Sequence, residues 1–222
     1  MTVSNKGRGL LPLALLATLL VAFVAVGCSG AQGDAPAEKS DEASTQQTVD
    51  PNDPYASGIH HARIEVEDYG TIEVTLNANA APITVANFCH LAEEGFYDGL
   101  TFHRVVPGFM IQGGDPSGDG TGGSDQTITG EFSANGIANS IPHTRGTISM
   151  ARASDPDSAS SQFFIMQETT SSLDGQYAAF GTVTSGMEVV DAICEKVPVA
   201  DEASGLVAPE DQPVITLIEV LD

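Results

Sequence analysis

The segment from residue 102 to residue 115, FHRVVPGFMIQGGD, limits most strongly what this chain can fold into. Its residues fall into two alternating sets, with Val105, Phe109 and Ile111 on one side and Arg104, Met110 and Gln112 on the other. A period of two is typical of a β-strand, and Pro107-Gly108 interrupts the regular ladder. The segment contains no Ser, Cys or Lys that could act as a covalent nucleophile. It therefore predicts an apolar surface with one cation and one amide, suited to binding and twisting a neutral, partly apolar substrate.

Short patterned runs continue through residues 59–222. Strand alternation recurs in 59–67, 70–77, 146–151, 161–166, 178–183 and 214–221, and helical spacing occurs in 82–94 and 187–197. These runs give about eight strands and two helices without regular βαβ alternation. We expect a mainly β fold, a closed eight-stranded antiparallel barrel capped by two α-helices.

The first 58 residues have a different composition. Lys6 and Arg8 precede an almost continuous apolar run from Leu10 to Val26, and small residues stand directly before Cys28. This pattern resembles a bacterial lipoprotein signal peptide, whose last motif residue is the cysteine that receives the lipid. We expect residues 1–27 to be removed and Cys28 to be lipidated. The alternative is an uncleaved helix of about 17 apolar residues, the short limit for spanning a bilayer.

Residues 28–58 are rich in small, acidic and amide residues and predict a flexible acidic and polar tether ahead of a folded domain at 59–222. The whole chain has 8 basic and 30 acidic residues, a net charge of −22, which argues against nucleic acid as a partner. Cys89 and Cys194 fall in apolar helical patterns, so we expect buried thiols, although an extracytoplasmic disulfide stays possible.

Three other functions have weaker support in the sequence, namely phosphate binding, metal binding and hydrolysis. The glycine-rich stretch 115–127 lacks phosphate-loop spacing and the following lysine, so it predicts a surface loop. His60-His61 has no spaced partners, and we expect neither a metal nor a cofactor. A thiol or serine hydrolase ranks far behind because the sequence offers no plausible pair of nucleophile and base.

The central segment resembles the signature of the cyclophilins, the barrel-type peptidyl-prolyl cis-trans isomerases. Five further blocks resemble the family in its order, namely APITVANF (81–88), GTISMAR (146–152), SQFFI (161–165), LDG (173–175) and FG (180–181). The resemblance covers roughly Ile59 to Asp222, all of the predicted folded part. It implies a barrel with a helix at each open end and a substrate groove along one face.

The resemblance also implies an enzyme that speeds isomerisation of X–Pro bonds, here in extracytoplasmic protein folding. The catalytic positions fall on Arg104, Phe109 and Gln112, and the substrate-binding positions on Met110, Ala151, Arg152, Phe164, Leu173 and Tyr177. Its partners would be proline-containing unfolded or partly folded polypeptides. We expect a monomer that is held at the bacterial cell membrane through the N-terminal lipid.

Three positions depart from the pattern of many family members. Ser172 stands where many eukaryotic members have Trp, which puts tight cyclosporin binding in doubt, and Arg152 stands where Asn is common. Tyr177 takes the place of a pocket His, as in many bacterial members. These changes leave an alternative open, a proline-peptide-binding chaperone or scaffold module with little turnover.

Overall fold

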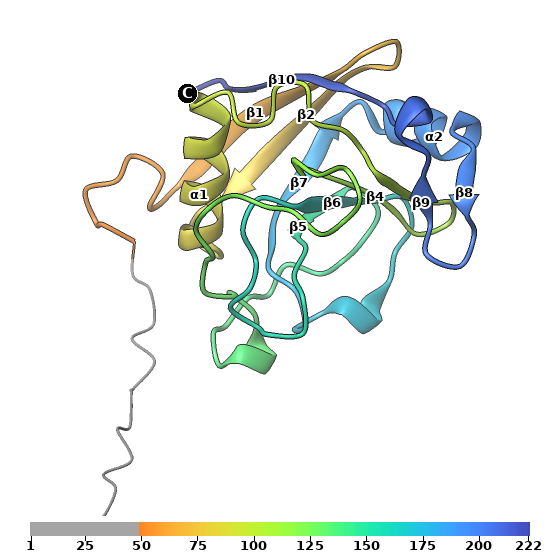
Figure 1. Cartoon of the computed structure of the whole chain (residues 1–222). Coiled ribbons are helices and arrows are strands. Elements are labelled where there is room, and N and C mark those ends of the chain that lie inside the picture. The colour runs from red at the N-terminus through yellow and green to blue at the C-terminus, as the bar shows by residue number, and fades with distance from the viewer. Residues whose placement is uncertain (1–48) are drawn as a thin grey trace, which may run out of the picture. The chain divides into compact units, whose positions relative to one another are not determined.

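The structure, a computed structural model, describes residues 49–222, which are rich in β-strands (Figure 1). The strands are β1 (Ile59–Val66), β2 (Gly70–Asn77), β3 (Arg104–Val106), β4 (Met110–Gly113), β5 (Thr147–Met150), β6 (Phe163–Met166), β7 (Ala179–Ser185), β8 (Val199–Asp201), β9 (Leu206–Val207) and β10 (Ile215–Val220). The α-helices are α1 (Pro82–Glu93) and α2 (Met187–Lys196), and the short 3-10 helices are η1 (Ser133–Asn135), η2 (Ser171–Leu173) and η3 (Pro209–Asp211).

All the strands belong to one sheet, in the order β10-β1-β2-β7-β5-β6-β4-β3-β9-β8, and each pairing is antiparallel. The two runs predicted as strands at 59–67 and 70–77 form an antiparallel hairpin, in which β1 pairs with β2 in continuous register from Ile59↔Asn77 to Val66↔Gly70. Asp68 (φ 61°) and Gly70 (φ 121°) provide the left-handed backbone of its turn.

The expected closed eight-stranded barrel is wrong in strand number and in closure, because the sheet has ten strands and ends at β10 and β8. The chain ahead of β3 does contact the start of β10, since the Ile215 N–H donates to Leu100 O (2.7 Å), and Thr101 forms an isolated bridge with Val214 just before that strand. Beyond that point β3 turns to β9 instead, and the Val105 N–H donates to Gly205 O (2.8 Å). The two short strands β9 and β8 therefore occupy the edge that a closing strand pair would need.

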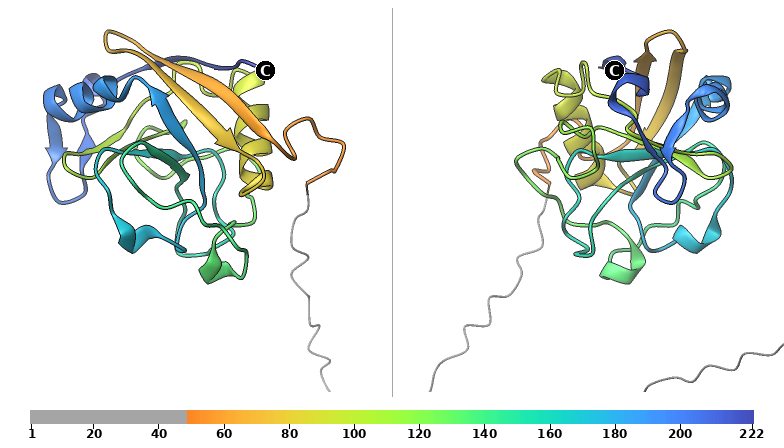
Figure 2. Two further views of the ribbon diagram at one scale, coloured as in Figure 1. Left: turned by 180° about the vertical axis from the view of Figure 1, so that it is seen from behind. Right: turned by 45° about the vertical axis from the view of Figure 1, so that its right-hand side comes forward.

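The two helices lie at opposite ends of the sheet (Figures 1 and 2). α1 packs on β10 and β2, and α2 packs on β2, β3 and β4. α2 is amphipathic, since it buries Val190 and Ile193 and exposes Glu195. α1 begins at Pro82, as expected, because proline fixes φ and lacks the N–H that a first helical turn leaves unpaired.

A buried carboxylate caps α1 from a distant loop. Ala81 at the N-cap has no side-chain oxygen, and Glu131 supplies the acceptors instead. One of its oxygens accepts from the Ile83 N–H (3.0 Å), and the other accepts from the N–H (2.8 Å) and the hydroxyl (2.7 Å) of Thr84. Burial raises the pKa of Glu131, and these three hydrogen bonds oppose that rise. The contact fixes the start of α1 to the loop that precedes η1.

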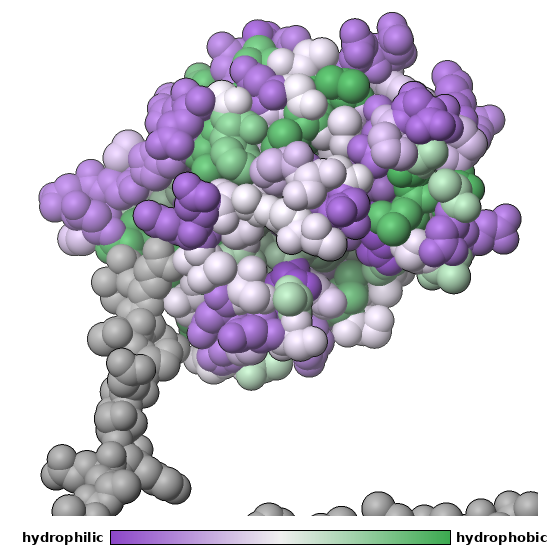
Figure 3. All heavy atoms as spheres, in the orientation of Figure 1, coloured by the Kyte–Doolittle hydropathy of each residue, from purple (hydrophilic) through white to green (hydrophobic). Residues whose placement is uncertain are grey.

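The core between α1 and the sheet is built on aromatic rings. Phe88 of α1 lies 5.5 Å from the Phe163 ring and 5.3 Å from the Phe180 ring, measured between centroids, and all three are fully buried. Strongly hydrophilic residues stand mainly around the rim of the face drawn in Figure 3, with paler and apolar residues toward its middle. Within residues 49–222 no helix is long and apolar enough to cross a membrane.

Packing begins before residue 59. Tyr55 is buried, and its hydroxyl donates to Glu93 of α1 (2.7 Å). Tyr55, near the end of the segment predicted as a tether, therefore contacts α1. The predicted signal peptide, Cys28 and the rest of that segment up to residue 48 lie outside the described residues.

Candidate active site

The central segment folds into a tight hairpin. β3 and β4 pair in the register Arg104↔Gln112, Val105↔Ile111 and Val106↔Met110, and Gly108 (φ 77°) allows the turn between them. Cross-strand partners share one face of a sheet, so Arg104 and Gln112 stand side by side. Pro107-Gly108 thus reverses the chain rather than interrupting one strand.

This turn changes the face of one residue. The alternation grouped Phe109 with Val105 and Ile111, but those two residues lie in the main core and Phe109 packs in a second cluster on the other side of the sheet. Phe109 lies in the turn, where the period of two does not apply. The assignment of Phe109 to a pocket, which came from the family resemblance, agrees with its position.

The second cluster forms the floor of a pocket of about 220 Å³, named here the hairpin pocket. The residues that line it are Arg104, Phe109, Met110, Gln112, Ala151, Arg152, Phe164, Leu173 and Tyr177. These are all nine residues that the sequence assigned to catalysis and substrate binding. Met110 and Phe164 are buried, and the Phe164 and Tyr177 rings meet edge to face at 5.7 Å. The pocket therefore has an apolar floor with polar groups along one side.

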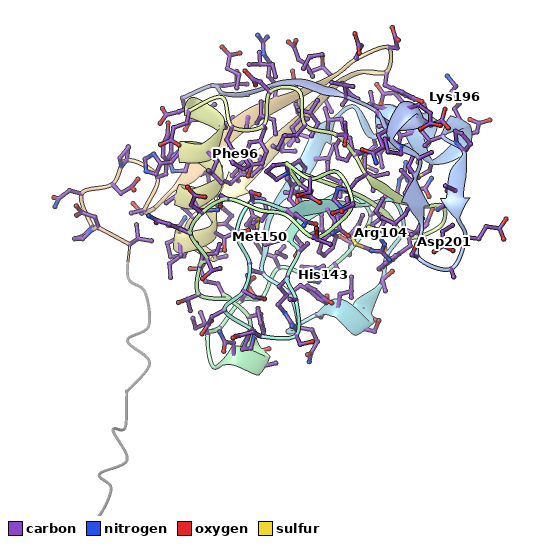
Figure 4. The ribbon with its side chains drawn as sticks, viewed as in Figure 1. Phe96, Arg104, His143, Met150, Lys196 and Asp201 are labelled. Atoms are coloured by element: carbon purple, nitrogen blue, oxygen red, sulfur yellow. The ribbon has the colours of Figure 1, made fainter. Side chains whose placement is uncertain are left out.

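Three contacts hold Arg104 at the pocket edge beside the β8–β9 loop (Figure 4). Its Nε donates to Ser204 O (2.6 Å), and its Nη1 donates to Gln112 Oε1 (3.1 Å) and lies 3.9 Å from Met110 Sδ. Within residues 49–222 its Nη2 has no hydrogen-bond partner, so a donor is left for a ligand. Burial lowers the pKa of Arg104 from the ordinary arginine value.

A second glutamine, which the sequence analysis left without a role, extends this arrangement. Gln112 Nε2 donates to Gln162 Oε1 (2.8 Å), and Gln162 Nε2 donates to Gly122 O (2.8 Å). The signal for Gln162 was its spacing, because in extended chain a residue two positions before Phe164 faces the same side as Phe164. The hydrogen bonds run from Arg104 to the glycine-rich loop.

The glycine-rich loop is organised by its own carboxylate. Asp115 is buried and accepts from the backbone N–H groups of Ser117 (2.8 Å), Asp119 (3.1 Å) and Gly120 (2.6 Å). The backbone N–H groups that a phosphate would need therefore already donate to the Asp115 carboxylate. The loop presents carbonyl oxygens to Gln162 instead.

Arg152 also lines the hairpin pocket. Its guanidinium carbon is 4.8 Å from the centre of the Tyr177 ring and 5.0 Å from that of Phe132. Its Nε (3.1 Å) and Nη2 (2.9 Å) donate to Gln176 O. Two aromatic faces and a carbonyl thus hold this side chain in one place.

A buried histidine supports the pocket wall from behind. The His143 ring stacks on Phe164 at 6.0 Å, its Nδ1 donates to Asp174 Oδ1 (3.1 Å), and its Nε2 accepts from the Ser149 hydroxyl (3.0 Å). This order of Ser, His and Asp matches a hydrolase triad, which no pattern in the sequence predicts. Ser149 is fully buried, however, so no substrate can reach its oxygen. Burial lowers the pKa of His143, and Asp174 opposes that shift.

Comparison with known proteins identifies the chain. Residues 61–220 match the family model described as "Cyclophilin type peptidyl-prolyl cis-trans isomerase/CLD". Peptidyl-prolyl cis-trans isomerase B of Bacillus subtilis (strain 168) is 54% identical over 125 residues, which are 55% of this chain and 82% of the relative. Peptidyl-prolyl cis-trans isomerase A of Dickeya dadantii (strain 3937) is 47% identical over 131 residues, or 57% of this chain and 67% of the relative.

A solved structure agrees with these sequence matches. The crystal structure of a Cryptosporidium parvum cyclophilin-type peptidyl-prolyl cis-trans isomerase in the presence of the dipeptide Ala-Pro is similar with a TM-score of 0.64 at 31% identity. The match covers 73% of this chain and 99% of that chain. The fold, the pocket and these relatives define the protein as a peptidyl-prolyl cis-trans isomerase. The chain belongs to the cyclophilin-type family of these enzymes.

Proposed function

We propose that Arg104 is the catalytic group and that the hairpin pocket holds the proline ring of the substrate. The observation that carries this proposal is the position of the Arg104 guanidinium at the edge of an apolar pocket, with Nη2 unpaired within residues 49–222. A proline ring has no N–H and is apolar, so it matches the floor formed by Met110 and Phe164. Phe109, in the turn between β3 and β4, packs against the same floor.

The chemistry follows from the peptide bond. Rotation about the C–N bond has a barrier of about 18–20 kcal/mol because resonance gives that bond partial double character. Twisting ends the resonance and leaves a lone pair on the prolyl nitrogen. An N–H of Arg104 donates to that lone pair in the twisted state, whereas the planar isomers offer no such acceptor. Arg104 therefore binds the transition state more tightly than either ground state, which lowers the barrier.

The other polar groups hold the flanking peptide. Gln112 is fixed between Arg104 and Gln162, and it can hydrogen-bond the substrate backbone without losing its orientation. The backbone of Ala151 and Arg152 borders the same pocket and pairs with the extended peptide. Fixing both flanks while one bond turns requires no proton transfer.

The test compares isomerisation of an Ala-Pro test peptide by the wild type, Arg104→Ala and Arg104→Lys. We expect kcat/KM of Arg104→Ala to fall about 10²-fold or more, because one pre-positioned donor is lost. Lys keeps the charge but loses the planar fork, so Arg104→Lys should also be slow. Arg145→Ala is the matched control, since Arg145 pairs with Asp191 at the surface. Full activity of Arg104→Ala would overturn the assignment. A wild type that binds the peptide without accelerating it would favour the chaperone alternative.

We also propose that the enzyme works outside the cytoplasm as a monomer, anchored to the bacterial cell membrane by a lipid on Cys28. The support is the positive, apolar and small-residue order of residues 1–28. The test is fatty-acid labelling and detergent-phase partition of the wild type and Cys28→Ala in a bacterial host. Labelling that is lost in the variant supports the proposal. An unlabelled wild type overturns it, and equal partition of both proteins points to an uncleaved helix.

A further inference from the structure

The arginines of the described residues differ in their partners. Residues 49–222 contain Arg63, Arg104, Arg145 and Arg152. Arg63 pairs with Glu219 (2.7 Å) and Arg145 with Asp191 (2.6 Å), both at the surface. Within the described residues, Arg104 and Arg152 have no carboxylate at salt-bridge distance. In a chain with a net charge of −22, both of these unpaired arginines line the same groove.

The groove continues beyond the hairpin pocket. A second pocket of about 200 Å³, named here the loop pocket, shares Gln112, Ala151 and Arg152 with the first. Its other lining residues are Gly120, Thr121, Gly122, Ala153, Ser158, Ser160 and Gln162. Neither pocket is lined by an acidic residue. A pocket of about 520 Å³ beside α1, in contrast, is lined by Asp50, Asp53, Glu94 and Asp125.

Arg152 stands at the junction of the two pockets, and its charge is not neutralised. Its hydrogen bonds go to the backbone carbonyls of Ala153 (2.9 Å) and Gln176 (2.9 Å), which orient the guanidinium without cancelling its charge. The rings of Phe132 and Tyr177 hold it on the other faces. A fixed, partly exposed cation loses little conformational entropy when it binds an anion.

We propose that Arg152 makes this isomerase selective for proline peptides that carry an acidic side chain close to the proline, on the side that enters the loop pocket. The inference rests on the proposed function, because it takes the hairpin pocket as the proline site. A residue next to the one bound there reaches the loop pocket, where small and hydroxyl-bearing walls leave room for a carboxylate. Acidic groups elsewhere on the protein repel such peptides, so the two arginines provide the local attraction.

The experiment uses the full chain in mild detergent and an exchange measurement by NMR, which avoids the sequence preference of a coupling protease. Matched peptides carry Glu, Gln or Lys at one of the two positions before or after an Ala-Pro pair. At low salt we expect a kcat/KM for the best Glu peptide about three- to tenfold above its Gln counterpart, with the Lys peptide below both. The ratio should approach one as salt screens the charges.

Three variants separate charge from packing. Arg152→Gln should bring the Glu-to-Gln ratio to about one, whatever its effect on absolute rates. Arg152→Lys keeps a cation and should keep a ratio above one. Arg145→Gln, which removes an arginine away from the groove, should leave the ratio unchanged. A wild type that is active on all peptides with equal efficiency overturns the inference alone, as does an Arg152→Gln variant that keeps the preference. A wild type inactive on every peptide overturns the proposed function itself.

Discussion

At the scale of single residues, the site depends on side chains that position other side chains. Arg104 and Gln112 are each held by neighbours, and Gln162 connects them to the glycine-rich loop. A flexible arginine without these contacts would lose rotamer freedom at the moment of reaction. Because these hydrogen bonds already fix the side chain in the folded protein, the loss of rotamer freedom occurs during folding and not during the reaction.

Gln162→Leu tests this link. The change keeps the size of the side chain and removes its hydrogen bonds to Gln112 (2.8 Å) and to the glycine-rich loop, so Gln112 and Arg104 become less well oriented. We expect kcat/KM to fall about three- to tenfold, because Gln112 loses the bond that orients it towards the substrate. The measurement is isomerisation kinetics, with Gln126→Leu on the exposed part of the glycine-rich loop as the control. Unchanged kinetics in Gln162→Leu would show that the link has no role.

The burial of one histidine, His103, predicts that the stability of the fold depends on pH. His103 is fully buried, neither ring nitrogen has a hydrogen-bond partner within the described residues, and burial lowers its pKa. The unfolded chain, in which a histidine has a pKa near about 6.5, then binds more protons than the folded chain. This contribution to stability is complete above that value and is lost as pH falls through the lowered pKa.

Urea unfolding at pH 7.5 and at pH 5.5 should therefore give a smaller free energy of unfolding at the lower pH. In His103→Leu the loss between the two pH values should be smaller than in the wild type. His61→Leu, whose side chain is 55% exposed, should show the full loss. Equal losses in all three proteins would assign the pH dependence to other groups.

At the scale of elements, α1 depends on a cap that no local sequence pattern contains. Glu131→Ala removes the acceptors of two backbone N–H groups and of the Thr84 hydroxyl. Loss of a cap together with buried donors left unpaired should lower the free energy of unfolding by about 2 kcal/mol or more. Urea unfolding measures the difference. Glu94→Ala at the exposed end of the same helix is the control, with an expected change within about 0.5 kcal/mol. A comparable loss in both variants would contradict the capping role.

Elements with a repeated pattern could be predicted from the sequence, and short ones could not. β1 and β2 each have eight residues and show a clear alternation of buried and less buried positions. β8 and β9 have three and two residues, too few to show any period. These two strands also occupy the edge of β3, where a closed barrel would need another partner strand. The expected barrel closure was therefore wrong because strands this short leave no pattern in the sequence. The nine pocket residues were found through family blocks, whereas Gln162, Glu131 and the Ser149–His143–Asp174 set depend on register and loop packing across the sheet.

At the scale of the whole molecule, the same strands serve the core and the pocket. Ile111 and Ile165 face the main core, and Met110, Phe164 and Met166 on the same two strands form the pocket floor. Because interiors are close-packed, a shift on one face would disturb the other. The pocket is therefore as rigid as the core behind it, which suits an enzyme that must hold both flanks of a bond while it turns.

The two cysteines of the folded part report on that rigidity. Cys89 on α1 and Cys194 on α2 are free and buried, and burial raises the pKa of each thiol to about 12. The thiolate is the reactive form, so both thiols should react with an aromatic disulfide reagent only when the fold opens.

In a Cys28→Ser protein, which leaves these two thiols as reporters, we expect native labelling about 10³-fold or more slower than labelling in denaturant. Adding Ser185→Cys on the exposed end of β7 should create one thiol that reacts at once. If Cys89 alone reacts quickly, α1 opens without the rest of the fold, and the shared packing of core and pocket does not extend to that helix. If neither reacts before global unfolding, the helices, the sheet and the pocket floor behave as one cooperative unit. Neither of these two thiols is then accessible to an oxidant in the native protein.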